Sequence, residues 1–461
     1  MLRLSTLGLL ALGLVATPAL AQKQTPPPGD PPRDFVLPAK SELTLSNGLV
    51  VTLIPYGTLP KATVQLIIDA GNADEGANEI WLADLLGDLM EEGTNSRSAE
   101  DIAAEAARMG GEINIGVGLD QTSIAGDVLS EFAPDILALI ADIAQNPSLP
   151  GSEIDRLKRD RVRELSIQKT QPQAIALAEF RKVMYGEHPY GRIFPTEAMV
   201  EGYTIEQVRA FYNTHFNASR ARLYIAGVFD EQAVRSAVEA AFGKWKGGME
   251  SSRELPTPRS QREVYIVDIP GAAQSNVYIG LPTIDPSNPD YIPLLVTNSL
   301  LGGSFGSRIT RNIREEKGYT YSPFSSVSVR YRDGYWVQTA AVTTDVTGPA
   351  IKEIFYEINR LQQEPPSAEE LDGIKNYMAG TFVLQNSSRQ GIIGQINFLN
   401  LHGLPDTYLS TFVERIHAVT PDDVQRITQT YLRDEDMLIV ISGDRKAIQS
   451  QVAGFGPIAS D

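Results

Sequence analysis

Asp84 and Asp88 are residues whose type and spacing could form a chemical site in this 461-residue chain. They lie four positions apart in residues 79–92, where the apolar pattern predicts a helix, so both carboxylates would face one side of it. Two carboxylates suit Mg²⁺, Ca²⁺ or Mn²⁺ better than Zn²⁺. Paired helix acids are more often a solvated surface patch, and both interpretations remain open from the residues alone.

Other catalytic chemistries find little support in the sequence. The chain contains no cysteine, which excludes disulfides, thiolate metal sites and a cysteine nucleophile. No two histidines form the i, i+4 pair that is typical of helical zinc ligands. The histidines are His188, His215, His402 and His417. No predicted strand is followed by G-x-S-x-G, a Walker loop or G-x-G-x-x-G, so serine hydrolase and nucleotide-binding functions are not indicated.

A glycine-rich segment, residues 300–308, is the second candidate site. Gly302 and Gly303 permit left-handed backbone conformations and the close approach of another backbone, which suits a loop pressed against an extended peptide. Phosphate binding is less favoured, because no Gly-Lys-Ser/Thr follows.

Residues 81–94, WLADLLGDLMEEGT, resemble the active-site helix of the pitrilysin/insulinase family of zinc peptidases. In that family the helix carries H-x-x-E-H, followed by a short run that ends in Gly-Thr or Gly-Ser. Asp84 and Asp88 stand at the positions of the two zinc-binding histidines, and Gly87 stands at that of the glutamate base. The family's third ligand, a glutamate on a later helix, is matched by Glu164, which follows Asp88 by 76 residues.

The resemblance therefore implies a peptidase scaffold that has lost its catalyst, with no metal ligands assigned in this chain. The set Asp84, Asp88 and Glu164 could still hold a cation that prefers oxygen ligands. Without a metal the three carboxylates would repel one another and raise at least one pKa. In either case Gly87 cannot act as a base.

The second half of the chain resembles the C-terminal domain of the same family. There an arginine and a tyrosine seven residues apart donate hydrogen bonds to the substrate carbonyl and to the charge that develops on it. Arg314 and Tyr321 have this spacing, and a guanidinium and a phenol are good fixed donors for an oxyanion. The alternative is that Arg314 pairs with Glu315 or Glu316 and Tyr321 packs in the core. By the same resemblance, the peptide path would be lined by Gly302, Gly303 and Phe305.

The segments that must position these residues repeat along the chain. Thr204 and Thr420 each begin a predicted helix and lie 216 residues apart. Gly227 and Gly443 each close a short apolar strand and are again 216 residues apart. An ungapped offset over two elements indicates two copies of one α/β unit, although a coincidental likeness is the alternative.

We predict an α/β (α+β) fold of two homologous domains, each a mixed β-sheet with helices packed mainly on one face, similar to mitochondrial processing peptidase. In the first half we expect a hairpin at Asn47-Gly48 and helices near residues 98–109, 130–145, 152–170 and 173–184. The predicted boundaries are a signal peptide at 1–21, a Pro-rich linker at 22–39, an N-terminal domain with the degenerate zinc motif at 40–245, a linker at 246–262 and a C-terminal domain with the glycine-rich loop and the Arg/Tyr pair at 263–455.

Charge and the N-terminal residues indicate where the protein acts. A net charge of −17 disfavours nucleic acid and anionic lipid as partners. Arg3, the apolar run 7–15 and Ala19-Leu20-Ala21 are typical of a signal peptide cut after Ala21, and no later segment is apolar over enough residues to span a membrane. We expect a periplasmic or secreted protein.

The resemblance implies the zinc-free subunit of a split metalloendopeptidase. A homologous subunit with an intact H-x-x-E-H motif would hold the zinc, and this chain would have no cofactor of its own. It would bind unfolded peptide, supply Arg314 and Tyr321 to the transition state, and be inactive alone. The alternative is a non-catalytic scaffold or peptide-binding subunit. Independent hydrolysis is disfavoured, because the zinc ligands and the base are both missing.

Overall fold

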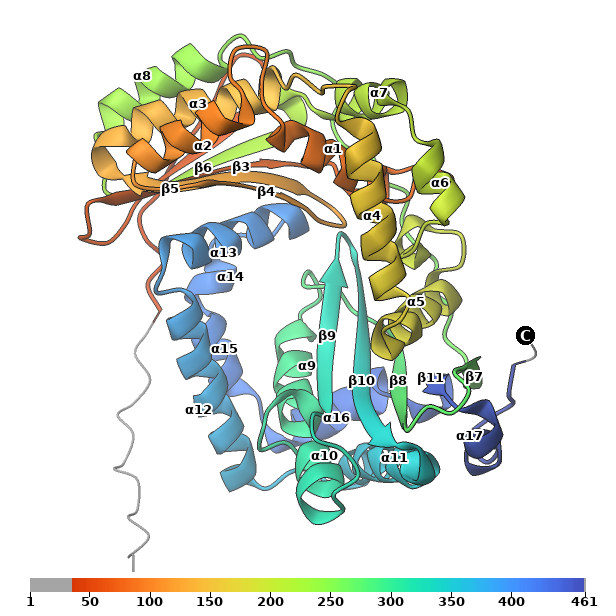
Figure 1. The fold of residues 1–461 in the computed structure, drawn as a ribbon. Coiled ribbons are helices and arrows are strands. Elements are labelled where there is room, and N and C mark those ends of the chain that lie inside the picture. The colour runs from red at the N-terminus through yellow and green to blue at the C-terminus, as the bar shows by residue number, and fades with distance from the viewer. Residues whose placement is uncertain (1–34, 460–461) are drawn as a thin grey trace, which may run out of the picture. The chain divides into compact units, whose positions relative to one another are not determined.

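A computed structural model describes residues 35–459 and contains two mixed β-sheets with helices packed against them (Figure 1). The predicted signal peptide and most of the predicted Pro-rich linker lie outside the described residues. The predicted α/β class with two mixed sheets is confirmed.

The first sheet has the strand order β1-β2-β6-β3-β5-β4. Its strands are β1 (Ser41–Thr44), β2 (Val50–Pro55), β3 (Lys61–Ile68), β4 (Ile113–Val117), β5 (Thr122–Leu129) and β6 (Ala221–Gly227). β1 and β2 are antiparallel, with the turn at Asn47-Gly48, where Gly48 has a φ of 93° that suits glycine. The expected hairpin is therefore confirmed.

The second sheet has the strand order β7-β11-β8-β10-β9. Its strands are β7 (Glu263–Asp268), β8 (Gln274–Thr283), β9 (Phe324–Arg330), β10 (Asp333–Thr343) and β11 (Leu438–Gly443). In each sheet the last strand in sequence lies between two strands that precede it: β6 between β2 and β3, and β11 between β7 and β8. β6 runs parallel to β2 and antiparallel to β3, and β11 runs parallel to β7 and antiparallel to β8. The two halves are thus built on one plan, as the repeat predicts.

The helices of the first half include those expected from the apolar pattern. They are α1 (Leu82–Glu91), α2 (Ala99–Arg108), α3 (Ala133–Gln145), α4 (Ile154–Gln168), α5 (Pro172–Tyr185), α6 (Glu197–Gly202), α7 (Ile205–His215) and α8 (Glu231–Phe242). Short 3₁₀ turns in this half are η1 (Asn72–Asp74), η2 (Ser130–Phe132), η3 (Pro189–Gly191) and η4 (Ala218–Arg220).

The second half contains two π-helical turns, η5 and η6, next to the glycine-rich segment. Its helical elements are α9 (Tyr291–Asn298), η5 (Ser299–Gly303), α10 (Arg308–Thr310), η6 (Arg311–Glu316), η7 (Thr344–Val346), α11 (Thr347–Gln363), α12 (Ala368–Gln385), α13 (Arg389–His402), α14 (Thr407–Ser410), α15 (Phe412–Ala418), α16 (Pro421–Tyr431), η8 (Asp434–Asp436) and α17 (Arg445–Val452). In residues 35–459, none of the helices combines the length and apolar character needed to cross a bilayer.

The repeated helix starts owe their position to threonine caps. Thr204 precedes α7, and its hydroxyl accepts a hydrogen bond from the backbone N–H of Gln207, whose side chain in turn accepts from the N–H of Thr204. Thr420 and Asp423 form the same reciprocal pair at the start of α16. Such a capping box satisfies two backbone donors that a helix start leaves free. The two predicted helix starts are therefore confirmed.

Each sheet is also covered by one helix from the other half. α5 of the first half packs on β8 and β11 of the second sheet, and α13 of the second half packs on β3 and β6 of the first (Figure 1). The buried cluster under α5 joins Phe180 and Met184 to Val337 and Val440. The cluster under α13 joins Ile392, Ile393 and Ile396 to Ile54, Ile67, Tyr224 and Ala226. The apolar pattern of the sequence does not predict this exchange of helices, because it does not show which sheet a helix covers.

Candidate functional site

The three acids of the degenerate zinc motif surround one arginine, Arg161, which α4 presents to α1. Its Nε and Nη2 donate to the two carboxylate oxygens of Asp88, each at 2.7 Å. Its Nη1 donates to Glu164 Oε2 at 2.9 Å and lies 3.8 Å from Asp84 Oδ1. The same guanidinium also donates to the backbone carbonyl of Asp84. A fixed positive charge therefore lies among the residues that match the family's zinc ligands.

These contacts correct the interpretation of the acids as a solvated patch. The side chains of Asp84 and Asp88 are only 21% and 28% exposed, and both are engaged by Arg161. The pKa of Asp84 is raised, mainly because burial disfavours its charged form and further because Asp88 and Glu164 repel it, although Arg161 opposes the shift. The expected rise in pKa is confirmed, but burial contributes more to it than repulsion between the carboxylates.

The Val117 side chain crowds position 87, where the family carries its catalytic glutamate. A Cβ at this position would lie 2.8 Å from Val117 Cγ2 of β4. In the described part of the chain, no group of three or more His, Asp or Glu side chains is arranged to hold a metal ion. The packing of α1 against β4 thus crowds the position of the family's base, and Arg161 of α4 pairs with the acids at the positions of its ligands.

Glu75 is a buried acid at the start of α1 that the sequence analysis missed. It accepts hydrogen bonds from the backbone N–H groups of Ala83 and Trp81 at 2.9 and 3.1 Å, and from the amide of Asn72 at 3.1 Å. The same Asn72 amide donates to Asp84 Oδ2 at 2.6 Å. Burial raises the pKa of Glu75 to about 8, although these hydrogen bonds oppose the shift. Glu75 is therefore mostly protonated at neutral pH.

The raised pKa of Glu75 predicts a pH-dependent stability. Between its ordinary pKa of 4.5 and about 8 the folded chain keeps a proton that the unfolded chain releases, so the free energy of unfolding falls as pH rises through this window. Between pH 5 and 8 the free energy of unfolding should decrease by on the order of 3 kcal/mol less in Glu75→Gln than in the unchanged protein. Urea unfolding at three pH values measures it, with the exposed Glu100→Gln as control. Equal slopes for Glu75→Gln and the unchanged protein would contradict the assignment.

Arg314 and Tyr321 lie together on the surface, with Phe305 as a third member. The guanidinium carbon of Arg314 lies over the Phe305 ring, 4.4 Å from its centroid, and over the Tyr321 ring at 4.9 Å. Phe305 is 67% exposed and Tyr321 is 79% exposed. We call these three residues the Arg314 stack. The alternative in which Tyr321 packs in the core is wrong, and in the described part of the chain Arg314 forms no salt bridge with Glu315 or Glu316.

Stacking leaves the donors of Arg314 available. The guanidinium contacts both rings, and Arg314 makes no hydrogen bond within residues 35–459. The stack therefore contacts the cation without using its hydrogen-bond donors, and the phenol of Tyr321 is a second donor in the same stack.

Gly302 and Gly303 end the π-helical turn η5 and pack against the second sheet. A Cβ on Gly302 would lie 2.6 Å from Ser325 Oγ and 2.5 Å from Gln338 Oε1, and one on Gly303 would lie 2.4 Å from Asn298 Nδ2. Internal packing thus already requires glycine at both positions. Their role in a peptide path stays a prediction, and Phe305 is the exposed residue of the three predicted to line it.

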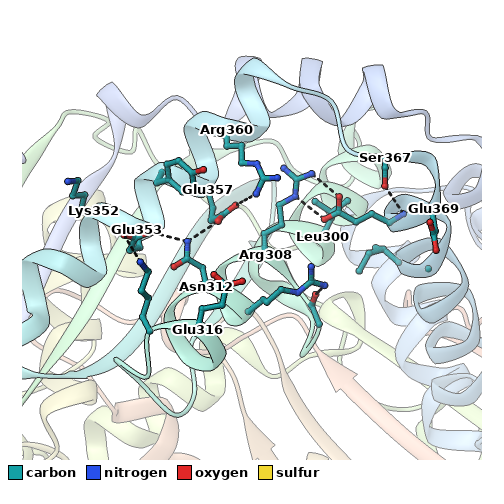
Figure 2. A pocket seen from close by; sticks show the side chains of 17 residues that line it. Leu300, Arg308, Asn312, Glu316, Lys352, Glu353, Glu357, Arg360, Ser367 and Glu369 are labelled. Atoms are coloured by element: carbon teal, nitrogen blue, oxygen red, sulfur yellow. Dashed lines mark hydrogen bonds and ion pairs between the residues drawn. The ribbon is translucent and has the colours of Figure 1, made fainter. Parts of the chain in front are cut away.

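The segment that carries Arg314 is anchored by ion pairs and hydrogen bonds beside a polar cavity of about 930 Å³. Figure 2 shows Arg308 and Asn312, from α10 and η6, turned toward this cavity. Arg308 Nε and Nη2 donate to the two carboxylate oxygens of Glu370 on α12 at 2.9 and 2.8 Å. The amide of Asn312 donates to Glu353 and Glu357 on α11 at 3.0 and 2.9 Å. These contacts tie α10 to α12 and η6 to α11, so the backbone that carries Arg314 is anchored on both sides.

Two family models match this chain. The model described as Insulinase (Peptidase family M16) covers residues 51–195, and the one described as Peptidase M16 inactive domain covers residues 202–378. Fold and site together define a metallopeptidase homologue whose zinc-ligand positions are occupied by an ion-pair cluster. The chain belongs to the insulinase family, peptidase family M16.

The chain is also similar to zinc proteases in sequence and to two solved structures in fold. An uncharacterized zinc protease of Streptomyces coelicolor is 24% identical over 86% of this chain and 88% of its own length, and one of Bacillus subtilis is 23% identical over 87% and 97%. A solved peptidase M16 inactive domain from Pseudomonas fluorescens has a TM-score of 0.81 at 24% identity and covers 88% of this chain and 98% of its own. A protease from Helicobacter pylori has a TM-score of 0.82 at 19% identity, over 88% and 100%. These structures share the two-domain fold.

Proposed function

We propose that this chain is the zinc-free subunit of a two-chain zinc metalloendopeptidase. Its partner is a homologous subunit with an intact H-x-x-E-H motif, which binds the zinc and activates the water. This chain contributes peptide binding and presents Arg314 and Tyr321 to the partner's site. The observation that carries the proposal is the exposed Arg314 stack, which holds two hydrogen-bond donors at the surface.

The ion-pair cluster around Arg161 supports the proposal that the partner, and not this chain, binds the zinc. A Zn²⁺ ion among Asp84, Asp88 and Glu164 would have to displace a guanidinium that makes hydrogen bonds with two of these carboxylates. Two like charges at one position are strongly unfavourable in a partly buried site. The zinc of the active complex is therefore assigned to the partner.

The place of action is the periplasm or the cell exterior. The apolar run 7–15, followed by Ala19-Leu20-Ala21, supports export and cleavage after Ala21. The substrate is an unfolded peptide, since an extended chain can lie along an exposed surface and meet both subunits.

The experiment compares hydrolysis of a fluorescence-quenched unfolded peptide by this chain, by the H-x-x-E-H subunit and by their mixture, with zinc counted in each. Activity in the mixture, with zinc in the partner, is the expected result. Stoichiometric zinc and activity in this chain alone would overturn the proposal. A complex that forms but gains no activity over the partner alone would favour the second candidate, a scaffold or peptide-binding subunit.

A further inference from the structure

A second cavity, of about 490 Å³, opens between α9, η5, α12 and the helices α13–α15, and we call it the aromatic pocket. None of its lining residues is charged, whereas arginines, lysines and glutamates dominate the lining of the cavity in Figure 2. In a chain with a net charge of −17, a neutral cavity of this size is a distinct chemical environment. Its volume lies within the range of ligand pockets, roughly 300–1,000 Å³.

Aromatic rings form most of the apolar wall of this pocket. They belong to Tyr291, Tyr377, Phe382, Phe398, Tyr408 and Phe412. Several of them already contact one another, since the rings of Phe382 and Phe412 stack at 4.3 Å and Tyr408 lies 6.1 Å from both Phe398 and Phe412. Aromatic rings bind another ring by offset or edge-to-face contact, and Met378 adds an adaptable side chain to the wall.

Polar groups in the lining lack partners inside the protein. The hydroxyl of Tyr408, a residue only 7% exposed, has no hydrogen-bond partner in the described part of the chain. The side-chain amides of Gln385 and Gln395 likewise make no hydrogen bond within residues 35–459. A buried phenol normally finds a partner, and free amides can pair with the N–H and C=O groups of a bound backbone. The amides of Gln385 and Gln395 suit a ligand that carries peptide bonds, whereas the Tyr408 hydroxyl is enclosed by protein atoms.

One glycine of the lining joins the pocket to the predicted peptide path, and another has free space beside it. Gly303, which is predicted to line that path, is also part of the pocket lining. Gly394 of α13 is another lining residue, and a Cβ placed on it would meet no atom within 4 Å. A side chain at position 394 would therefore have free space in which to extend.

We propose that the aromatic pocket receives a large aromatic side chain of the peptide substrate and thereby selects the peptides that this subunit binds. The proposal rests on the peptide-binding role given above. The neutral wall disfavours charged side chains, because a charge buried without a partner is costly. The substrate class is thus an unfolded peptide with an aromatic residue near the segment that contacts Gly303.

The test uses this chain without its partner, so that it does not depend on catalysis. Fluorescein-labelled unfolded peptides that differ only in a central Phe, Ala or Glu are titrated with the chain, and binding is followed by fluorescence anisotropy. The Phe peptide should bind about tenfold or more tightly than the Ala peptide, and the Glu peptide should bind most weakly. Gly394→Leu should fill the pocket and reduce the Phe preference to about twofold or less.

Gly380→Leu is the matched control. Gly380 lies on α12 with no atom within 4 Å of an added Cβ, and it does not line the pocket. Both substitutions replace an exposed helical glycine, so both should favour the helix to a similar extent. Gly380→Leu should keep the Phe preference. Equal binding of the Phe and Ala peptides by the unchanged chain, or a preference that survives Gly394→Leu, would overturn the pocket. If this chain prefers the Phe peptide but its mixture with the H-x-x-E-H subunit hydrolyses no peptide, the pocket stands and only the catalytic role is refuted.

Discussion

Arg314→Ala, in the complex with the H-x-x-E-H subunit, is expected to lower kcat for peptide hydrolysis about 10²–10³-fold. The guanidinium lies over the rings of Phe305 and Tyr321, which hold it in place, and under the proposal it donates to the charge that develops on the scissile carbonyl. Tyr321→Phe removes the second donor while it keeps the stacked ring, so it should lower kcat by a similar factor. KM should change little, since these donors act mainly in the transition state. Steady-state kinetics of the mixture measure both.

Arg311→Ala is the matched control for this prediction. Arg311 is an exposed arginine at the start of the same π-helical turn, η6, and it lies outside the Arg314 stack. Its removal should leave kcat within about twofold, which is typical of a surface substitution. Size-exclusion chromatography checks that every variant still assembles. An equal loss of kcat in Arg311→Ala, or full activity in Arg314→Ala, would contradict a catalytic role for the stack.

Restoring the family motif alone is expected not to restore zinc binding. In the triple variant Asp84→His, Gly87→Glu and Asp88→His, the guanidinium of Arg161 still lies among the ligands, and the new Glu side chain meets Val117. Adding Arg161→Ala and Val117→Ala removes both obstacles and leaves Glu164 as the third ligand. We expect zinc affinity to rise by a factor of about 10³ or more between the triple and quintuple variants, because ligand geometry and charge then suit the ion.

Isothermal titration with Zn²⁺ measures this difference, and thermal unfolding shows whether each variant is folded. The control adds only Arg161→Ala and Val117→Ala to the unchanged chain, which supplies carboxylates but no imidazole and should bind Zn²⁺ weakly. Tight zinc binding by the triple variant would show that Arg161 is not the barrier.

Local elements could be predicted because their signals are local. The Asn47-Gly48 turn, the capping threonines Thr204 and Thr420 and the matching offset of Gly227 and Gly443 each depend on a few neighbouring residues. These features established the α/β class and the repeat before any tertiary contact was known. Arg314 and Tyr321, by contrast, are candidates because this segment resembles the family's C-terminal domain, in which an arginine and a tyrosine have the same spacing.

The role of Arg161 could not be predicted, because it depends on α4 lying against α1. The sequence places Arg161 three positions before Glu164, which puts both on one face of a helix and is the one local signal that was available. Similarly, Glu75 precedes α1 by several residues, and its burial appears only when the chain folds back over the helix start. The amphipathic pattern of α5 predicts a buried face but not which sheet covers it.

The exchange of α5 and α13 between the two sheets has a consequence for how the protein can be divided. Ile392, Ile393 and Ile396 cover residues of the first sheet, while Phe180 and Met184 cover the second. A fragment made of either half alone would expose an apolar sheet surface to water and carry a helix with no sheet to bind. The two fragments would instead complement one another on mixing. The linker therefore keeps the two halves at a high effective concentration relative to each other. We expect the two repeats to fold and unfold together.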